Sequence, residues 1–95
     1  MYAVALYMLA PGQAERIGSV YPRHRAYLDA FQAATADILL IGPFSELDGG
    51  PGSMAVFRSR AAAERFCADD PFVREGVVGE VQVRDWNALD FTPFA

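Results

Sequence analysis

Four short stretches of the chain are rich in hydrophobic residues, and each has the length of a β-strand. Tyr2 to Leu9 and Asp37 to Gly42 are apolar at successive positions, a pattern typical of strands that are buried on both sides. Ser53 to Arg58 is a third stretch of strand length. Val77 to Trp86 alternates between apolar and polar residues, as expected for a strand with one buried face. The pattern therefore predicts four strands.

The segment between the first two strands follows a helical period instead. From Val20 to about Ala36, apolar residues recur at the spacings that place them on one face of a helix, and His24 and Tyr27 belong to that face. Ser19 precedes the segment and is the predicted N-cap, because serine side chains accept hydrogen bonds from the first free backbone amides.

A shorter helix is predicted at Ala61 to Ala68, and Asp70-Pro71 begins a further turn, since proline suits the first position of a helix. The elements follow the order βαββαβ, which is the ferredoxin-like α+β pattern. It forms an antiparallel four-stranded sheet with helices on one face. The 95 residues make a single domain, residues 1–95.

Two helices cover only one face of such a sheet, although two of the predicted strands are apolar on both faces. A second copy that packs sheet against sheet would cover the other face. Hydrophobic residues make up 53% of the chain, and its tail, residues 87–95, carries Leu89, Phe91, Pro93 and Phe94. We predict a homodimer, or a higher oligomer, in which this tail packs on the partner subunit.

Composition argues against several other functions. The net charge of −4 disfavours binding to nucleic acid. The apolar runs are too short to cross a membrane, and the N-terminus lacks the basic lead of a secretory signal. Cys67 is the only cysteine, so no internal disulfide forms, and one cysteine with one histidine predicts no metal site. We expect a cytoplasmic protein without metal or cofactor.

His24 and Asp70 are the candidates for chemistry, and each has two interpretations. His24, the only histidine, is either a hydrogen-bonded core residue or an acid/base group that faces a pocket between helix and sheet. Asp70 is a helix N-cap, and it can also be the carboxylate that orients His24. Asp69 competes for both roles of Asp70. The sequence alone does not bring His24 and Asp70 together.

Four further residues are candidates for contact with a ligand. Ser45 follows the second strand and either stabilises a turn or forms a hydrogen bond to a substrate. Tyr7 and Tyr27 are core aromatic residues whose hydroxyls can reach the edge of a pocket. Phe72, just after Asp70, completes the predicted substrate-binding set.

Several ordered motifs resemble the YCII (YciI-related) family of small bacterial proteins. These are the opening strand YAVALYML, Pro22-x-His24-x-x-Tyr27-Leu28, Gly42-Pro43-Phe44, Asp48-Gly49, Gly52-Ser53 and Ala68-Asp69-Asp70-Pro71-Phe72. The resemblance implies a dimeric α+β barrel of ferredoxin-like subunits, with His24 and Asp70 as the active-site pair. Family members often carry arginine three residues before the histidine, where this chain has Tyr21. An anion-binding role that the family's arginine would imply therefore does not carry over to this position.

The leading hypothesis is a cofactor-independent enzyme in which His24 is the general acid/base and Asp70 orients it. Its reaction would be a proton transfer or an elimination, of the isomerase or lyase type, on a small carbonyl, lactone or aromatic-derived substrate. One alternative is a non-catalytic dimer that binds a small ligand or serves as an accessory module. A further alternative is a cofactor-free monooxygenase of the same architecture.

Overall fold

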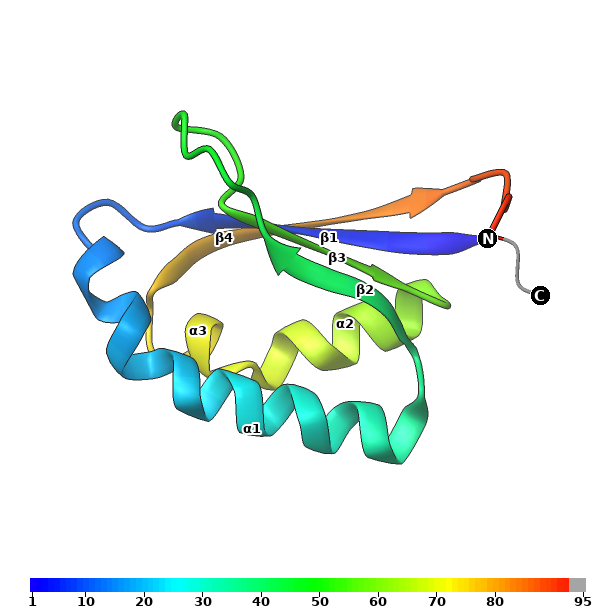
Figure 1. Cartoon of the computed structure of the whole chain (residues 1–95), viewed down its shortest axis with the longest axis horizontal. Helices are drawn as coiled ribbons and strands as arrows, with labels where there is room; N and C mark the ends of the chain where they lie inside the picture. Colours follow the sequence, from blue (N-terminus) through cyan, green and yellow to red (C-terminus); the bar gives the residue numbers. More distant parts are fainter. Residues whose placement is uncertain (93–95) are drawn as a thin grey trace.

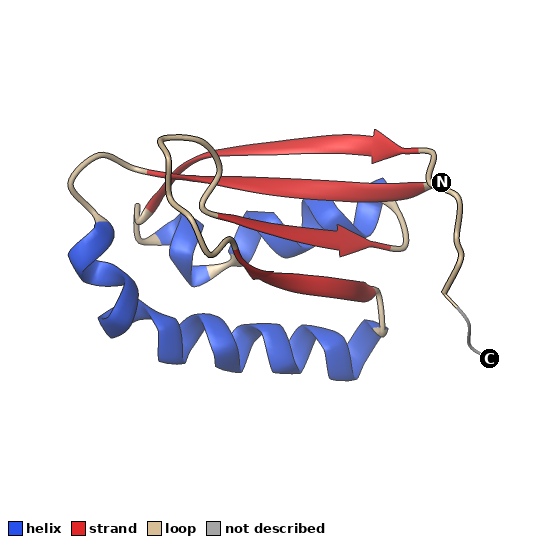
Figure 2. Cartoon of the chain, turned by 45° about the horizontal axis from the view of Figure 1, so that its top comes forward, coloured by secondary structure: helices blue, strands red, loops and turns tan. Residues whose placement is uncertain are grey.

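The computed structural model describes residues 1–92, which form a four-stranded antiparallel sheet with its helices on one side (Figure 1). The elements are β1 (Tyr2–Leu9), η1 (Ala14–Arg16), α1 (Ile17–Thr35), β2 (Ile38–Pro43), β3 (Ser53–Phe57), α2 (Arg60–Asp69), α3 (Pro71–Arg74) and β4 (Val78–Trp86). The strand order is β2-β3-β1-β4. The predicted βαββαβ α+β fold is thus confirmed, and Figure 2 shows the strands lying side by side above the helices.

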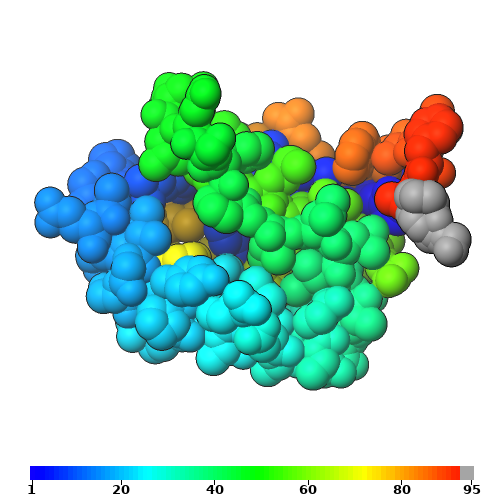
Figure 3. Space-filling model, in the orientation of Figure 1, coloured from blue at the N-terminus to red at the C-terminus, as the bar shows by residue number. Residues whose placement is uncertain are grey.

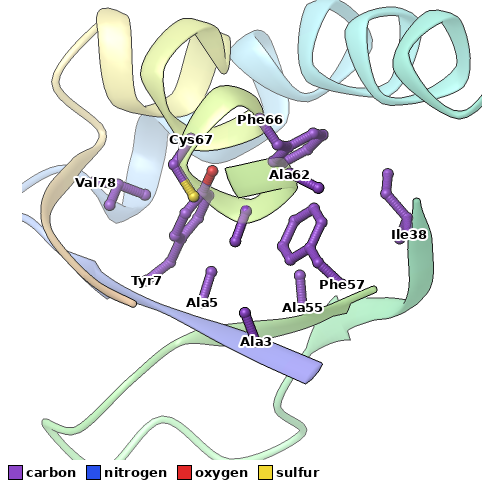
Figure 4. Packing of buried hydrophobic residues seen from close by; sticks show 11 residues of the cluster. Ala3, Ala5, Tyr7, Ile38, Ala55, Phe57, Ala62, Phe66, Cys67 and Val78 are labelled. Carbon is purple, nitrogen blue, oxygen red and sulfur yellow. The ribbon is translucent and has the colours of Figure 1, made fainter. Parts of the chain in front are cut away.

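The pleat of β1 separates a covered face of the sheet from an open one. Ala3, Ala5 and Tyr7 are buried towards the helices, and in register Ala3 pairs with Phe57 of β3. Because alanine is small, the ring of Phe57 and that of Phe66 from α2 fill the space above the sheet (Figure 4). The core therefore lies between β1, β3 and α2, and Tyr7 is its polar end.

Helix α1 begins earlier than the sequence predicted. The 3₁₀ turn η1 leads directly into Ile17, and Arg16 stands at the N-cap position without a side-chain cap. Ser19 lies inside the helix, and its hydroxyl donates to the carbonyl of Arg16 at 3.1 Å. The prediction of Ser19 as N-cap is therefore wrong, because the preceding turn already supplies the geometry that a capping side chain would otherwise provide.

The junction between α2 and α3 agrees with the prediction from sequence. Ser59 caps α2 by accepting from the backbone amide of Ala62 at 3.1 Å. Asp70 caps α3, and its Oδ1 accepts from the amide of Phe72 at 3.0 Å. The backbone of Asp70 is extended between the two helices, which turns its side chain inwards, where it is 0% exposed.

Within residues 1–92, no helix covers the outer face of the sheet (Figure 1). Leu40 of β2 is 71% exposed, and Leu89 and Phe91 of the tail are exposed as well. The tail returns past the start of β1, where the Tyr2 hydroxyl donates to Asp90 at 2.7 Å. The other tail residues of the dimer prediction, Pro93 and Phe94, lie outside the described residues. No helix of the described part has the length and apolarity needed to cross a bilayer.

Candidate active site

His24 and Asp70 meet in the interior, although they come from separate elements. His24 is one of two buried residues of α1, and Asp70 comes from the junction of α2 and α3. The distance from His24 Nδ1 to Asp70 Oδ1 is 2.8 Å. A carboxylate only accepts hydrogen bonds, so Nδ1 of the imidazole is the donor, and in the neutral form of the ring the lone pair lies on Nε2.

Asp70 accepts hydrogen bonds on both of its oxygens. The Tyr7 hydroxyl donates to Oδ2 at 2.6 Å, while His24 and the amide of Phe72 share Oδ1. Burial, together with Cys67 and Asp70 nearby, raises the pKa of Tyr7 far above its ordinary value. The hydroxyl therefore stays protonated and donates. Three donors compensate the carboxylate for the loss of water.

Aromatic side chains hold the imidazole of His24 in place. The Phe72 ring stacks on it with a centroid distance of 4.4 Å and an interplanar angle of 30°. Phe66 approaches edge-on at 6.4 Å, and Tyr21 lies 5.9 Å away. These contacts and the bond to Asp70 together set the orientation of the ring.

The imidazole lines a cavity of about 230 Å³ that opens between α1 and the β2–β3 loop. Figure 3 shows this hollow between the cyan surface of α1 and the green β2–β3 segment, with yellow, gold and blue atoms deeper inside. As far as residues 1–92 describe the lining, it contains no Asp, Glu, Lys or Arg. The ionisable side chains of this lining are thus His24 and the two tyrosines, Tyr7 and Tyr21.

The mouth of the cavity is apolar. Ile17 and Tyr21 from α1, and Phe44 and Leu47 from the loop after β2, all line the cavity and are all exposed. Large apolar side chains grouped around an opening favour a ligand that carries its own apolar surface.

The sequence model of the YCII-related domain family matches residues 1–87. The chain belongs to this family. No curated protein matches the sequence. The family assignment predicted from the ordered motifs is therefore confirmed.

Solved structures share the fold of this YCII-related domain. The 5-chloro-2-hydroxyhydroquinone dehydrochlorinase of Burkholderia phenoliruptrix AC1100, solved with 2,5-dihydroxybenzoquinone, is 24% identical over 92% of this chain and 94% of its own, with a TM-score of 0.71. An antibiotic biosynthesis monooxygenase is 20% identical, and the match covers 94% of this chain and 98% of the monooxygenase, with a TM-score of 0.55. A nipsnap family protein of Agrobacterium tumefaciens is 14% identical, and the match covers 97% of this chain and 90% of the nipsnap protein, with a TM-score of 0.58. At these identities the likeness concerns the fold.

The YCII-related domain brings together four of the six site residues predicted from sequence. His24, Tyr7 and Phe72 line the cavity, and Asp70 lies directly behind His24. Tyr27 does not reach the lining described here, because its hydroxyl donates to the carbonyl of Phe66 at 2.7 Å. Burial raises the pKa of Tyr27 to about 12.

Ser45 also lies outside this lining, in the β2–β3 loop, where its neighbours Phe44 and Leu47 face the cavity instead. Sequence reasoning did not select these two residues, or Tyr21, as site residues. For Tyr21 a signal exists, since it precedes His24 by three positions and so shares its helix face. The loop residues carry no such periodicity.

Within the described residues, no group of three or more His, Cys, Asp or Glu side chains is arranged to hold a metal ion. Cys67 is a buried free thiol near Tyr7. Burial raises the pKa of this thiol to about 11, so at neutral pH it is an uncharged core residue.

Proposed function

We propose that this YCII-related domain is a cofactor-independent acid/base enzyme in which His24 moves a proton and Asp70 orients it. The observation that carries the proposal is the buried 2.8 Å contact between His24 Nδ1 and Asp70 Oδ1 at the wall of a cavity. A carboxylate in this position fixes the tautomer of the imidazole and stabilises the imidazolium that forms when a proton arrives.

The proton-accepting atom is Nε2 of His24. Nδ1 is occupied by Asp70, and the hydrogen bonds described for residues 1–92 include none to Nε2. A C–H bond next to a substrate carbonyl would break, with its proton going to Nε2 and its electron pair forming an enolate. Return of the proton to another carbon completes an isomerisation, and loss of a leaving group with the electron pair completes an elimination.

The cavity favours a small, uncharged, ring-sized substrate. An apolar cavity of about 150 Å³ accommodates benzene, so the cavity of about 230 Å³ has room for one substituted ring. The lining described above offers no cation to a carboxylate or phosphate. The dehydrochlorinase neighbour, named for a chlorinated hydroxyhydroquinone and solved with a dihydroxybenzoquinone, supports ring compounds with carbonyl or hydroxyl groups as the first to test.

The test is a comparison of His24→Gln with Arg23→Gln, the exposed neighbour. Both variants are assayed for chloride release from a chlorinated hydroquinone, and for deuterium uptake next to the carbonyl of small ring ketones and lactones. We expect His24→Gln to lose roughly 10²–10⁴-fold in rate while circular dichroism shows a folded protein. Arg23→Gln should keep its rate. Full activity in His24→Gln would contradict the proposal.

A second candidate, a non-catalytic binding module, is favoured by the apolar rim of Ile17, Tyr21, Phe44 and Leu47. It predicts saturable binding of a small aromatic compound that survives His24→Gln, with no turnover of any substrate in the panel. The third hypothesis, a cofactor-free monooxygenase, predicts instead that quinol-like substrates cause oxygen uptake.

We further propose that the functional unit is a homodimer joined through the outer face of the sheet. Val4 and Leu6 of β1, paired with Val56 and Met54 of β3, lie on that face beside exposed Leu40. Leu40→Arg places a charge there and should lower the mass measured by light scattering from dimer to monomer. A monomeric mass of the unmodified chain at micromolar concentration would contradict the dimer.

The location of the protein in the cytoplasm also stays a prediction.

A further inference from the structure

We propose that Tyr7 is a positioning residue, which holds the Asp70 carboxylate in line with His24, and that its hydroxyl is not the ligand contact that the sequence predicted. The inference deepens the proposed function, because it concerns the same site. Its central test nevertheless needs no substrate, so it can succeed or fail independently of catalysis.

The geometry assigns the two oxygens of Asp70 to different partners. Oδ1 faces His24 Nδ1 at 2.8 Å and the amide of Phe72 at 3.0 Å, whereas Oδ2 accepts from the Tyr7 hydroxyl at 2.6 Å. Tyr7 stands on β1, one of the two inner strands of the sheet, and Figure 4 shows it rising from the strand towards α2 with its hydroxyl next to Cys67. The carboxylate is therefore held from both ends.

The consequence for His24 follows from electrostatics. Asp70 is 0% exposed, so its negative charge is balanced by hydrogen-bond donors and not by solvent. If the Tyr7 donor is removed, the remaining charge is balanced best when His24 takes up a proton. Loss of the hydroxyl should therefore shift the titration of His24 to higher pH.

Few other titratable groups face His24 from the elements packed around it. They are Asp70 from the α2–α3 junction, Cys67 of α2 and Tyr7 of β1 behind that carboxylate, and Tyr21 on the same helix. The charged side chains on either side of His24 along the helix are exposed and paired, Arg23 with Glu75 and Arg25 with Asp29. Among these groups, only Tyr7 donates to Oδ2 of Asp70 within residues 1–92.

The experiment is a proton NMR titration of the imidazole, which is unambiguous because the chain has a single histidine. Tyr7→Phe should raise the titration midpoint of His24 by about half a unit to one unit. Tyr27→Phe is the matched control, since it also removes a hydroxyl with a 2.7 Å hydrogen bond, but to the Phe66 carbonyl. Tyr27→Phe should leave the midpoint unchanged. An unchanged midpoint in Tyr7→Phe would overturn the proposal.

A double-mutant cycle tests whether Tyr7 acts through Asp70. In an Asp70→Asn background the charge is absent, so Tyr7→Phe should shift the midpoint by less than a third of its effect in the wild type. An equal shift in both backgrounds would contradict the proposal. If Tyr7→Phe alone does not fold, Asp70→Asn should restore folding, because an unpaired amide is less costly than an unpaired carboxylate. Failure of that rescue would also contradict it.

If the domain proves to be an enzyme, the acidic limb of its kcat/KM profile should move with the NMR midpoint in Tyr7→Phe. If it proves to be a binding module, the NMR shift is still expected, and only the proposed function fails. If catalysis by His24 is found without any shift of the midpoint, the role of Tyr7 fails and the proposed function stands.

Discussion

Two polar links connect α1 to the chain around α3, and they differ in burial far more than in length. His24 Nδ1 lies 2.8 Å from Asp70 Oδ1, between side chains that are 10% and 0% exposed. Arg23 donates to Glu75 at 2.6 and 2.8 Å, between side chains that are 56% and 33% exposed. Consecutive helical residues point about 100° apart, which is why one link faces the core and the other faces solvent.

This contrast teaches that the length of a polar link is a poor guide to the free energy that is lost when the link is broken. An exposed ion pair gains little, because water and salt screen it and because two long side chains lose freedom. A buried pair need not stabilise the fold more than apolar residues would, but removal of one partner leaves the other without compensation. The link to Asp70 is therefore intolerant of change, while the link to Glu75 tolerates it.

The largest expected effect is that of Asp70→Ala. This change removes the partner of His24 and Tyr7 and the N-cap of α3 together. We expect it to lower the free energy of unfolding by about 3–5 kcal/mol, measured by urea denaturation. Asp69→Ala is the matched control, since its side chain is 71% exposed and lies 3.5 Å from Arg74, and it should stay within about 0.5 kcal/mol of wild type. Similar losses in both would refute the contrast.

The fold was largely predictable, because it depends on periodicity. The apolar run predicts β1, whose pleat puts Ala3, Ala5 and Tyr7 on one side, and the helical period places His24 on the buried face of α1. The start of α1 was not predictable from the same signals. It depends on η1, whose backbone turn replaces a side-chain cap at Ser19.

The site was predictable only in part. The N-cap position of Asp70 follows from Asp-Pro at a helix start, and His24 follows from the helix period. Neither signal states that the two side chains meet, or that the Tyr7 hydroxyl reaches Asp70 across the core. The rim residues Phe44 and Leu47 depend on the path of the β2–β3 loop, which no period describes.

A smaller effect is expected at alkaline pH, and it should come from the buried region. Burial raises the pKa of Cys67 from its ordinary 9.0 to about 11, so the unfolded chain releases this proton first. The contribution of the buried, protonated Cys67 thiol to stability is therefore fully present below about pH 9 and is lost as the pH rises towards 11. We expect Cys67 to account for a loss of about 1–2 kcal/mol between pH 8 and pH 10.5 in urea denaturation.

The control for that prediction is Cys67→Ala, which removes this titrating group from both the folded and the unfolded chain. Its stability should decrease less than that of the wild type over the same range. A decrease remains, because burial raises the pKa of Tyr7 and Tyr27 as well. Parallel curves for Cys67→Ala and wild type would show that the thiol is not buried as described.

The smallest expected effect is that of Glu75→Gln, which breaks the exposed link to Arg23. The hydrogen bond from Arg23 lowers the pKa of Glu75, so the contribution of this link is present above the ordinary carboxyl range and is lost as the pH falls through the lowered value. At neutral pH and low salt, we expect the urea midpoint to fall by at most about 0.4 M.

Salt sharpens the comparison between the two links. In 1 M NaCl the screening length is about 3 Å, so the effect of Glu75→Gln should vanish, because both of its charges are accessible to ions. The effect of Asp70→Ala should keep most of its size, since ions do not reach a carboxylate that is 0% exposed. If salt reduced both effects by the same fraction, burial would not be what distinguishes the two links. The proposal that the buried Asp70 carboxylate holds His24 in a fixed orientation would then lose its support.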